Sequence, residues 1–240
     1  MNFSSFLSAC SSLVFPIRCP SCQRPSKVDF NELRICPKCR DSIKTAVSIT
    51  YRGRLQIFAG SVYTSDLSRV ILAAKEENQI QARIFLARQL SQSLEKALKD
   101  ISINRSQRIE DVVIIPIPSS KSADRRRGFA HIELLVNQLM EMNETLNIKV
   151  LNCLSHSRKI LDQTSLNFNE RAMNMKGAFV VDQVMHFEFY PIKNSNSAVF
   201  LVDDLVTSGA TVQAADLALS TLGARVDGVL ASCATAGFTH

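Results

Sequence analysis

Residues 199–211 read VFLVDDLVTSGAT, and this stretch decides the fold. Four apolar residues run into two adjacent carboxylates, Asp203 and Asp204, and a small polar loop follows at 207–211. A continuous apolar run of this kind is typical of a strand buried on both faces, as in a parallel sheet. Carboxylates at the end of such a strand lie at the rim where open α/β sheets bind ligands. A helical pattern follows the loop, so the stretch also predicts a phosphate site at a helix N-terminus.

The two adjacent acids restrict where this strand ends. Successive side chains on a strand point to opposite faces, so Asp203 and Asp204 are not both expected in the core, and we place the strand end near residue 203. Ionised carboxylates beside a phosphate loop indicate a site for vicinal hydroxyls and Mg²⁺. An acidic pair alone is more typical of a strand that ends in a polar turn. The whole string from 199 to 211 favours the ligand site.

Strand and helix patterns alternate along the second half of the chain. We expect strands at 111–117, 199–203 and 226–232, with helices at 128–142 and 211–222. This alternation predicts an α/β fold, with a parallel-cored sheet and helices on both faces. We divide the chain into an N-terminal module, residues 1–50, and a main domain, residues 51–240.

The segment between the module and the sheet has weaker signals. Residues 46–51 and 57–63 have strand patterns, and two helical patterns follow them before a polar connector at 101–110. Lys75 stands alone in the first helical pattern, and a lone lysine is most often a surface residue. His156 is also alone, and we expect a surface residue rather than a general base.

Four cysteines are spaced as metal ligands. Cys19 and Cys22 form one C-x₂-C pair, and Cys36 and Cys39 form another. Two such knuckles present four thiolates to one tetrahedral ion, which predicts a structural zinc site. Disulfides or redox C-x-x-C motifs are the competing interpretation. The start of the chain has no basic residue before Arg18, unlike a secretory signal, so we expect a reducing, cytoplasmic location, which disfavours disulfides.

Positive charge is concentrated near these cysteines. The formal net charge is +6, and residues 1–60 hold nine Lys/Arg against three Asp/Glu, whereas the two signs balance over residues 61–240. A basic surface of this kind attracts nucleic acid or an anionic partner, or it simply solvates the module, and the sequence favours neither. The apolar fraction of 46% can supply a full core. No apolar run approaches the roughly 20 residues of a membrane helix.

A second basic segment follows the strand pattern at 111–117. Residues 121–129 read KSADRRRGF, and Lys121 with the arginines at 125–127 predicts a diphosphate cradle of backbone N–H groups and cations. The alternative is a solvated basic turn, but its position after a second parallel strand weighs against that. Arg158 and Lys159 lie in a long polar segment and predict a lid that closes over the diphosphate.

These motifs together resemble the type I phosphoribosyltransferases and, among them, the ComF-type proteins, the family of competence protein F. The string at 199–211 resembles their signature for phosphoribosyl diphosphate (PRPP). Further features carry the resemblance: Phe15-Pro16 before the cysteine pairs, the helical pattern with Lys75, Ile115-Pro116-Ile117-Pro118, Arg127-Gly128-Phe129, Arg158-Lys159 with Gln163, Leu166, Arg171 and Asn174, and Gly177-Ala178-Phe179. One departure is Ala130, where the family usually has Asn.

The resemblance implies a type I phosphoribosyltransferase-like fold, preceded by a four-cysteine zinc ribbon. PRPP would bind with Mg²⁺, Asp203 and Asp204 would be catalytic and face the ribose hydroxyls, and residues 207–211 would surround the 5-phosphate. The implied PRPP-binding residues are Ser119, Ser120, Lys121, Arg126, Arg127, Arg158, Lys159, Asp203, Asp204, Val206, Thr207, Ser208, Gly209, Ala210 and Thr211.

The resemblance also implies a role in DNA uptake and natural transformation (competence). Its implied partners are PRPP, single-stranded DNA, and a competence helicase or another DNA-processing protein. The alternative is a non-enzymatic protein that uses the fold as a scaffold and binds single-stranded DNA or a partner. Thr207 stands where purine-salvage relatives have Asp, which argues against a purine acceptor but does not separate another acceptor from none.

Overall fold

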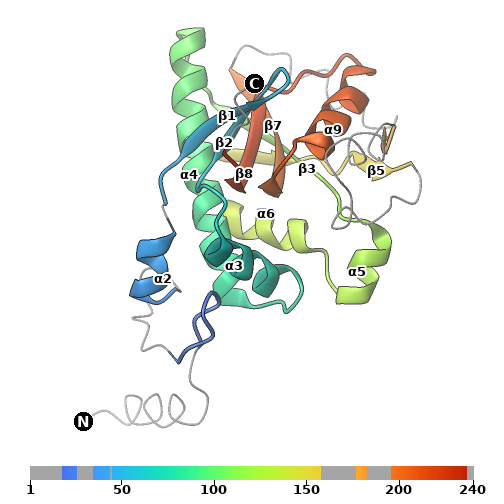
Figure 1. Cartoon of the computed structure of the whole chain (residues 1–240). Coiled ribbons are helices and arrows are strands. Elements are labelled where there is room, and N and C mark those ends of the chain that lie inside the picture. The colour runs from blue at the N-terminus through green and yellow to red at the C-terminus, as the bar shows by residue number, and fades with distance from the viewer. Residues whose placement is uncertain (1–17, 26–34, 44, 158–176, 183–195, 237–240) are drawn as a thin grey trace.

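A six-stranded sheet forms the centre of the molecule (Figure 1). The computed structural model describes residues 18–25, 35–43, 45–157, 177–182 and 196–236. The strands are, in their order across the sheet, β1 (Ser48–Arg52), β2 (Leu55–Ala59), β8 (Gly228–Ala234), β7 (Ser197–Val206), β3 (Asp111–Pro116) and β4 (Asn147–Val150). All neighbours pair in parallel except β1 and β2, which form an antiparallel hairpin. The predicted α/β class with a parallel-cored sheet is confirmed.

Helices cover both faces of this sheet. One face packs against α3 (Ser65–Lys75), α4 (Ile80–Arg105) and α6 (His131–Met142), and the opposite face packs against α9 (Ala210–Ser220). The residues of β7 alternate between the two sides. Phe200 and Val202 lie in the core with α4 and α6, whereas Val199 and Leu201 lie in the core with α9. Burial on both faces is the reason that this strand is apolar at successive positions.

The connections out of β3 and β7 run in opposite directions. From β3 the chain passes through α6 to β4 on one side, and from β7 it passes through α9 to β8 on the other. Right-handed crossovers in opposite directions place their helices on opposite faces, as observed. The adjacent strands β3 and β7 therefore form a topological switch point, where open α/β sheets bind ligands at the carboxyl ends of the strands.

The structure corrects several predicted boundaries. Strand β7 continues to Val206, so the two acids lie within it rather than at its end. Helix α4 continues through the first half of the predicted 101–110 connector to Arg105, because Ile101 still packs in the core. The predicted basic loop is a short helix, α5 (Lys121–Arg127).

Strand β4 and a small second sheet were not predicted. The second sheet consists of β5 (Leu154–His156) and β6 (Phe179–Val181), which pair antiparallel at the two ends of the long polar segment. Strand β4 forms one edge of the main sheet, and it is too short and too exposed to give a clear apolar pattern. Within the described ranges, no helix combines the length and apolarity needed to span a membrane.

Candidate functional site

The carboxyl ends of β3 and β7 lie side by side at the switch point. The Ile117 N–H, just beyond β3, donates to the Val202 carbonyl at 2.9 Å, which joins the two strand ends. The loop 207–209 then connects β7 to α9. Gly209, with φ +81°, is the residue before α9, in a left-handed conformation that favours glycine. The predicted polar loop therefore opens a helix of 11 residues, which is the arrangement that favours an anion.

The two adjacent acids have different surroundings. Asp204 is only 3% exposed, and Lys75 Nζ and His131 Nε2 each lie 3.3 Å from its Oδ2 atom. Asp203 remains partly exposed, and its Oδ1 accepts from the Asp204 N–H at 2.8 Å. The expectation that the two acids would not both lie in the core is confirmed, since only Asp204 is buried. Lys75 is not a simple surface lysine either, because the last turn of α3 directs it at this carboxylate.

This cluster shifts the ionisation of both acids. Burial alone would raise the pKa of Asp204, but Lys75 and His131 outweigh burial and hold that pKa below its usual range. The pKa of Asp203 is raised well above its usual range, by burial and by the charge of Asp204. Asp204 raises the pKa of Lys75 in turn. Asp204 is thus a fixed internal charge, and Asp203 is the carboxyl group whose protonation can respond to a ligand or cation.

Sequence reasoning missed two residues of the site. His131 begins α6 and is fully buried beside Asp204. Its position four residues before the buried Leu135 was a usable signal, because residues four apart share one helix face. Arg52 ends β1 and donates from Nε to the Thr207 carbonyl at 2.7 Å. An arginine beside a glycine in a hairpin turn gave no signal of burial.

The basic segment after β3 is a short helix rather than the predicted loop. From Asp124 onward its N–H groups bond within the helix, as in the Asp124 N–H to Ser120 carbonyl bond of 3.1 Å. The Ser120 side chain caps the helix by accepting from the Ala123 N–H. Arg127 is committed to Glu76, at 3.0 Å, and to Asp124, at 3.5 Å. The exposed cations of α5 are Lys121, Arg125 and Arg126.

The remaining predicted PRPP-binding residues fall into two groups at the same edge of the sheet. Ser119, Ser120 and Lys121 follow β3, and residues 206–211 end β7 and begin α9. Val206 and Ala210 are buried, whereas the three hydroxyl side chains between 207 and 211 are partly exposed. A small pocket opens beside Ser119, between the end of β3 and the start of α6. Arg158 and Lys159 lie outside the described residues.

His156 is partly buried rather than a free surface residue. Its Nε2 atom lies 3.0 Å from the Pro118 carbonyl, and its ring packs on Phe179 with the ring centroids 4.9 Å apart. His156 therefore connects the small second sheet to the end of β3.

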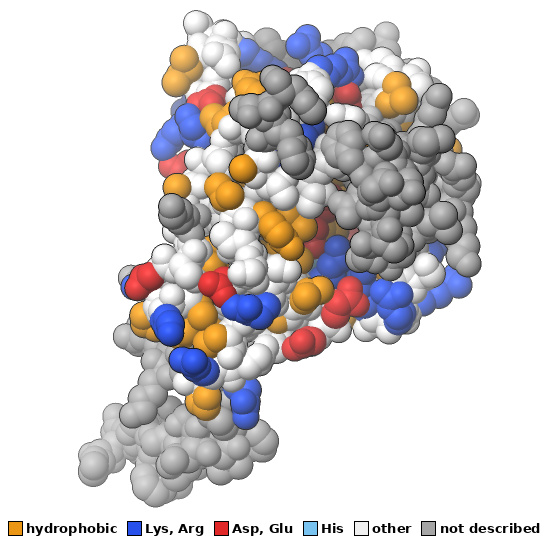
Figure 2. Space-filling view, viewed as in Figure 1, with side chains coloured by type: hydrophobic (Ala, Val, Ile, Leu, Met, Phe, Trp, Pro, Cys, Tyr) orange, Lys and Arg blue, Asp and Glu red, His pale blue; other side chains and the backbone are white. Residues whose placement is uncertain are grey.

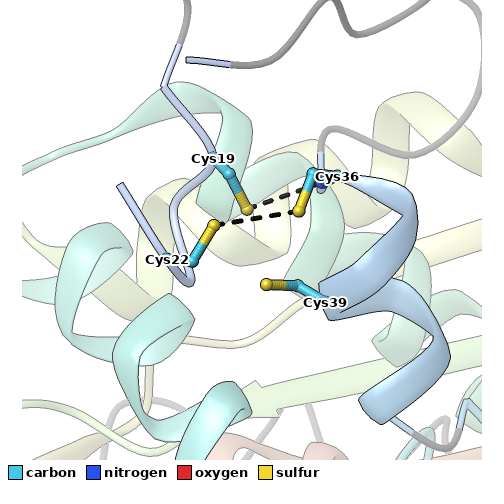
Figure 3. A group of neighbouring side chains, drawn as sticks. All are labelled: Cys19, Cys22, Cys36 and Cys39. Atoms are coloured by element: carbon cyan, nitrogen blue, oxygen red, sulfur yellow. Dashed lines mark hydrogen bonds between the residues drawn. The ribbon is translucent and has the colours of Figure 1, made fainter. Parts of the chain in front are cut away.

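The four predicted metal ligands converge on one point (Figure 3). Their sulfur atoms all lie within 4.8 Å of one another, and the Cys22 and Cys36 sulfurs are 3.8 Å apart. Thiolates about 2.3 Å from a tetrahedral zinc lie about 3.8 Å apart, so the cluster fits this ion. All cysteines in the described ranges are free thiols. The group can therefore hold a metal ion such as zinc, and the disulfide interpretation is not supported.

The thiols of the cluster differ in acidity. The backbone N–H of Arg24 lowers the pKa of Cys22 to about 7. Burial raises the pKa of Cys39 to about 12 and also raises that of Cys36. Binding of a metal ion requires thiolates, so it must release protons from these groups.

The cysteine module is fixed to α3. Arg69 on this helix donates from Nε to the Ser21 carbonyl at 2.6 Å. Cys19 and Cys39 lie in the same core cluster as Leu67 of α3. The helix that carries the module thus ends in Lys75, the cation that pairs with Asp204.

Basic side chains lie over the cysteine module and over α5, and at the top of the face shown in Figure 2. The exposed cations near the cysteines are Arg18, Arg24, Lys38 and Arg40. Those on α5 are Lys121, Arg125 and Arg126.

Comparison with known proteins identifies no relative: no family model matches the chain, and no curated protein is significantly similar to it.

Proposed function

We propose that this chain is a PRPP-binding protein of the type I phosphoribosyltransferase family, similar to the ComF-type members, that acts in DNA uptake during natural transformation. One observation carries the proposal. At the switch point, the strand that carries Asp203 leads within a few residues into a polar loop at the N-terminus of α9. A sugar phosphate needs both features, a carboxyl group for its hydroxyls and a set of N–H groups for its phosphate.

The ribose 5-phosphate part of the ligand would bind along the end of β7. The loop at 207–209 and the first turn of α9 provide backbone N–H groups, the positive end of the helix dipole, and the hydroxyls of Thr207, Ser208 and Thr211. Asp203 would accept hydrogen bonds from the ribose hydroxyls. Asp204 would act indirectly, as the buried charge that keeps Lys75 and His131 beside the strand.

The diphosphate part would lie toward the end of β3. Lys121 and Arg126 are exposed cations on α5 and would contact it, together with Ser119 and Ser120. Arg127 would contribute by fixing α5 through Glu76 rather than by direct contact. Lys and Arg are the side chains best suited to oxyanions, which supports this orientation of the ligand.

The proposed reaction breaks the C1–O bond of PRPP, whose electron pair leaves with diphosphate, and forms a bond from C1 to a nucleophilic atom of an acceptor, through an oxocarbenium-like transition state. The protein would hold the ribose and stabilise the charge of the departing diphosphate, so its contribution is mainly positional and electrostatic. Mg²⁺ suits the carboxylate of Asp203 because it prefers hard oxygen ligands, and when bound it would neutralise diphosphate charge. The acceptor is left open.

Calorimetric titration of PRPP with Mg²⁺ into the purified protein tests the proposal. Asp203→Asn should weaken PRPP binding, because each lost charge-assisted hydrogen bond costs about 1.5–3 kcal/mol. Asp100→Asn is the matched control, since Asp100 pairs with Lys96 on α4, away from the crevice. PRPP affinity that is equal in wild type and Asp203→Asn, or absent in wild type, would contradict the proposal.

A second function is favoured by the exposed cations around the cysteine cluster, which form a basic surface on a module fixed to α3. Such a surface can follow the phosphates of single-stranded DNA. The protein would then be a DNA- or partner-binding scaffold, with or without PRPP chemistry.

A further inference from the structure

The hairpin of β1 and β2 carries an arginine whose role the proposed reaction leaves unexplained. Arg52 is 6% exposed, and its guanidinium makes five hydrogen bonds. Nε donates to the Thr207 carbonyl at 2.7 Å. The terminal nitrogens donate to the Thr50 hydroxyl, the Tyr51 carbonyl, and both the carbonyl and the hydroxyl of Thr235, at 2.8–3.0 Å.

These bonds show that Arg52 acts on the protein itself and not on a ligand. A guanidinium has five N–H groups, and all five have protein acceptors here. All of the acceptors are uncharged oxygens, and burial lowers the pKa of Arg52. Burying a charge costs desolvation free energy, and an apolar side chain would fill the same space without that cost. The buried position of this cation therefore requires an explanation.

The contact with Thr207 determines which way the phosphate loop faces. A trans peptide is planar, and its C=O and N–H point in opposite directions. Arg52 and the Thr235 hydroxyl both donate to the Thr207 carbonyl, and so hold it toward the protein. The N–H of the next residue, Ser208, therefore points away from Arg52, toward the outer side of the loop.

The stem of Arg52 also fixes the end of the loop. Gly209 lies so close to it that a Cβ atom on Gly209 would be 2.5 Å from Cγ and 2.6 Å from Cβ of Arg52. This loop conformation, with φ +81° at Gly209, thus fits against Arg52 only because residue 209 has no side chain. The Arg52 side chain therefore fixes the conformation of the 207–209 loop at both of its ends.

We propose that Arg52 is a positioning residue for the phosphate site: it orients the Ser208 N–H and holds the loop in the shape that receives a phosphate monoester. Its buried positive charge adds to the field of the α9 N-terminus and favours a dianion at this end of the crevice. This inference rests on the proposed function, because it assigns the 5-phosphate of the ligand to this loop.

The test compares two ligands that use different halves of the crevice. Calorimetry with ribose 5-phosphate and with magnesium pyrophosphate is run on wild type, Arg52→Met and Thr235→Val, which removes the hydroxyl shared by Arg52 and Thr207. We expect both variants to lose about tenfold or more in affinity for ribose 5-phosphate. Their affinity for magnesium pyrophosphate should stay at the wild-type value. Arg52→Lys keeps the charge but not the five-donor fork, so it should remain impaired.

Arg54→Met is the matched control, because Arg54 comes from the same hairpin and binds Asp216 on α9 without contacting the loop. It should affect the two ligands equally or not at all. If the Arg52 and Thr235 variants lose affinity for both ligands to the same extent, Arg52 only stabilises the protein in general, and the inference is overturned. Unchanged ribose 5-phosphate binding in Arg52→Met would overturn it as well, while leaving the proposed function intact. A wild type that binds neither PRPP nor ribose 5-phosphate would overturn both.

Discussion

Replacing Lys75 with Met should destabilise the protein strongly, because it leaves the Asp204 carboxylate buried with a single partner. The side chain of Asp204 is 4% exposed, and Lys75 Nζ lies 3.3 Å from its Oδ2. Removing one member of a buried ion pair costs about 3–5 kcal/mol. Because Lys75 keeps 32% exposure and His131 remains beside Asp204, we expect a loss of about 2–4 kcal/mol in the free energy of unfolding.

Urea denaturation of a double-mutant cycle measures this interaction. Lys75→Met and Asp204→Asn should each destabilise the protein, and the double variant should be more stable than the sum predicts by about 1–3 kcal/mol. Lys99→Met is the control, because its pair with Glu95 on α4 is about two-thirds exposed on both sides, and it should change stability by less than about 0.5 kcal/mol. Additive effects of Lys75→Met and Asp204→Asn would refute the electrostatic explanation.

The pH dependence of this cycle has a defined sign. The pKa of Asp204 is lowered in the folded state, so its pairing stabilises the protein above the unfolded pKa of about 3.9 and is lost as the pH falls through the folded pKa. Without Lys75 the folded pKa of Asp204 should rise, and the stability difference between wild type and Lys75→Met should shrink on acidification. The raised pKa of Lys75 has the opposite consequence: its contribution is present below about pH 10.4 and is lost as the pH rises through the folded pKa.

The remaining predictions concern the cysteine module. Elemental analysis of protein purified without chelator should find one zinc per chain, and Cys22→Ser should lose it, whereas Cys153→Ala, away from the cluster, should not. Zinc affinity should fall on acidification because protons compete for the thiolates, and the fall should steepen below about pH 7, where Cys22 is also protonated in the metal-free protein. Fluorescence anisotropy with a labelled oligonucleotide at low salt should show weak single-strand binding that falls by about 0.7 log units per log unit of salt for each phosphate contacted. The double variant Lys38→Glu, Arg40→Glu should abolish this binding, whereas Lys99→Glu should leave it unchanged. If the wild-type protein does not bind the oligonucleotide, the DNA interpretation is wrong and the basic surface would instead bind a protein partner.

Sequence patterns identified the sheet because apolar runs depend on burial alone. The predicted strands at 111–117, 199–203 and 226–232 correspond to β3, β7 and β8, which have neighbours on both sides. The C-x₂-C pairs identified the metal cluster for a similar reason, since their spacing fixes a local knuckle whatever the rest of the chain does. Strand ends were predicted less well. The acids at 203 and 204 suggested the end of a strand, but β7 continues to Val206, and Lys75 Nζ and His131 Nε2 each lie 3.3 Å from the buried Asp204 carboxylate.

The sequence patterns did not predict these side-chain contacts because the partners are distant in sequence. The lone Lys75 was assigned to the surface because its carboxylate lies more than a hundred residues away, on a strand that α3 meets only in the folded protein. Arg52 and Thr207 are likewise separated by 155 positions. The basic run at 121–127 was misassigned as a loop because Ser120 caps it as a helix and Arg127 turns inward to Glu76. In each case the sequence shows which residues are charged, but it does not show which of these charges form pairs in the folded protein.

Helix α3 connects the two parts of the molecule that the sequence treats as separate. Its outer side receives the cysteine module through Arg69 and Ser21, and its C-terminal residues Lys75 and Glu76 hold Asp204 and Arg127. These last two contacts lie on β7 and α5, so the end of α3 contacts two elements near the carboxyl ends of β3 and β7. A metal ion in the cysteine cluster would add four ligand bonds to a module whose described residues include few buried apolar side chains, and such modules depend on their metal to stay folded. We therefore expect loss of the metal to affect more than the module, because α3 contacts the module through Arg69 and pairs with Asp204 through Lys75.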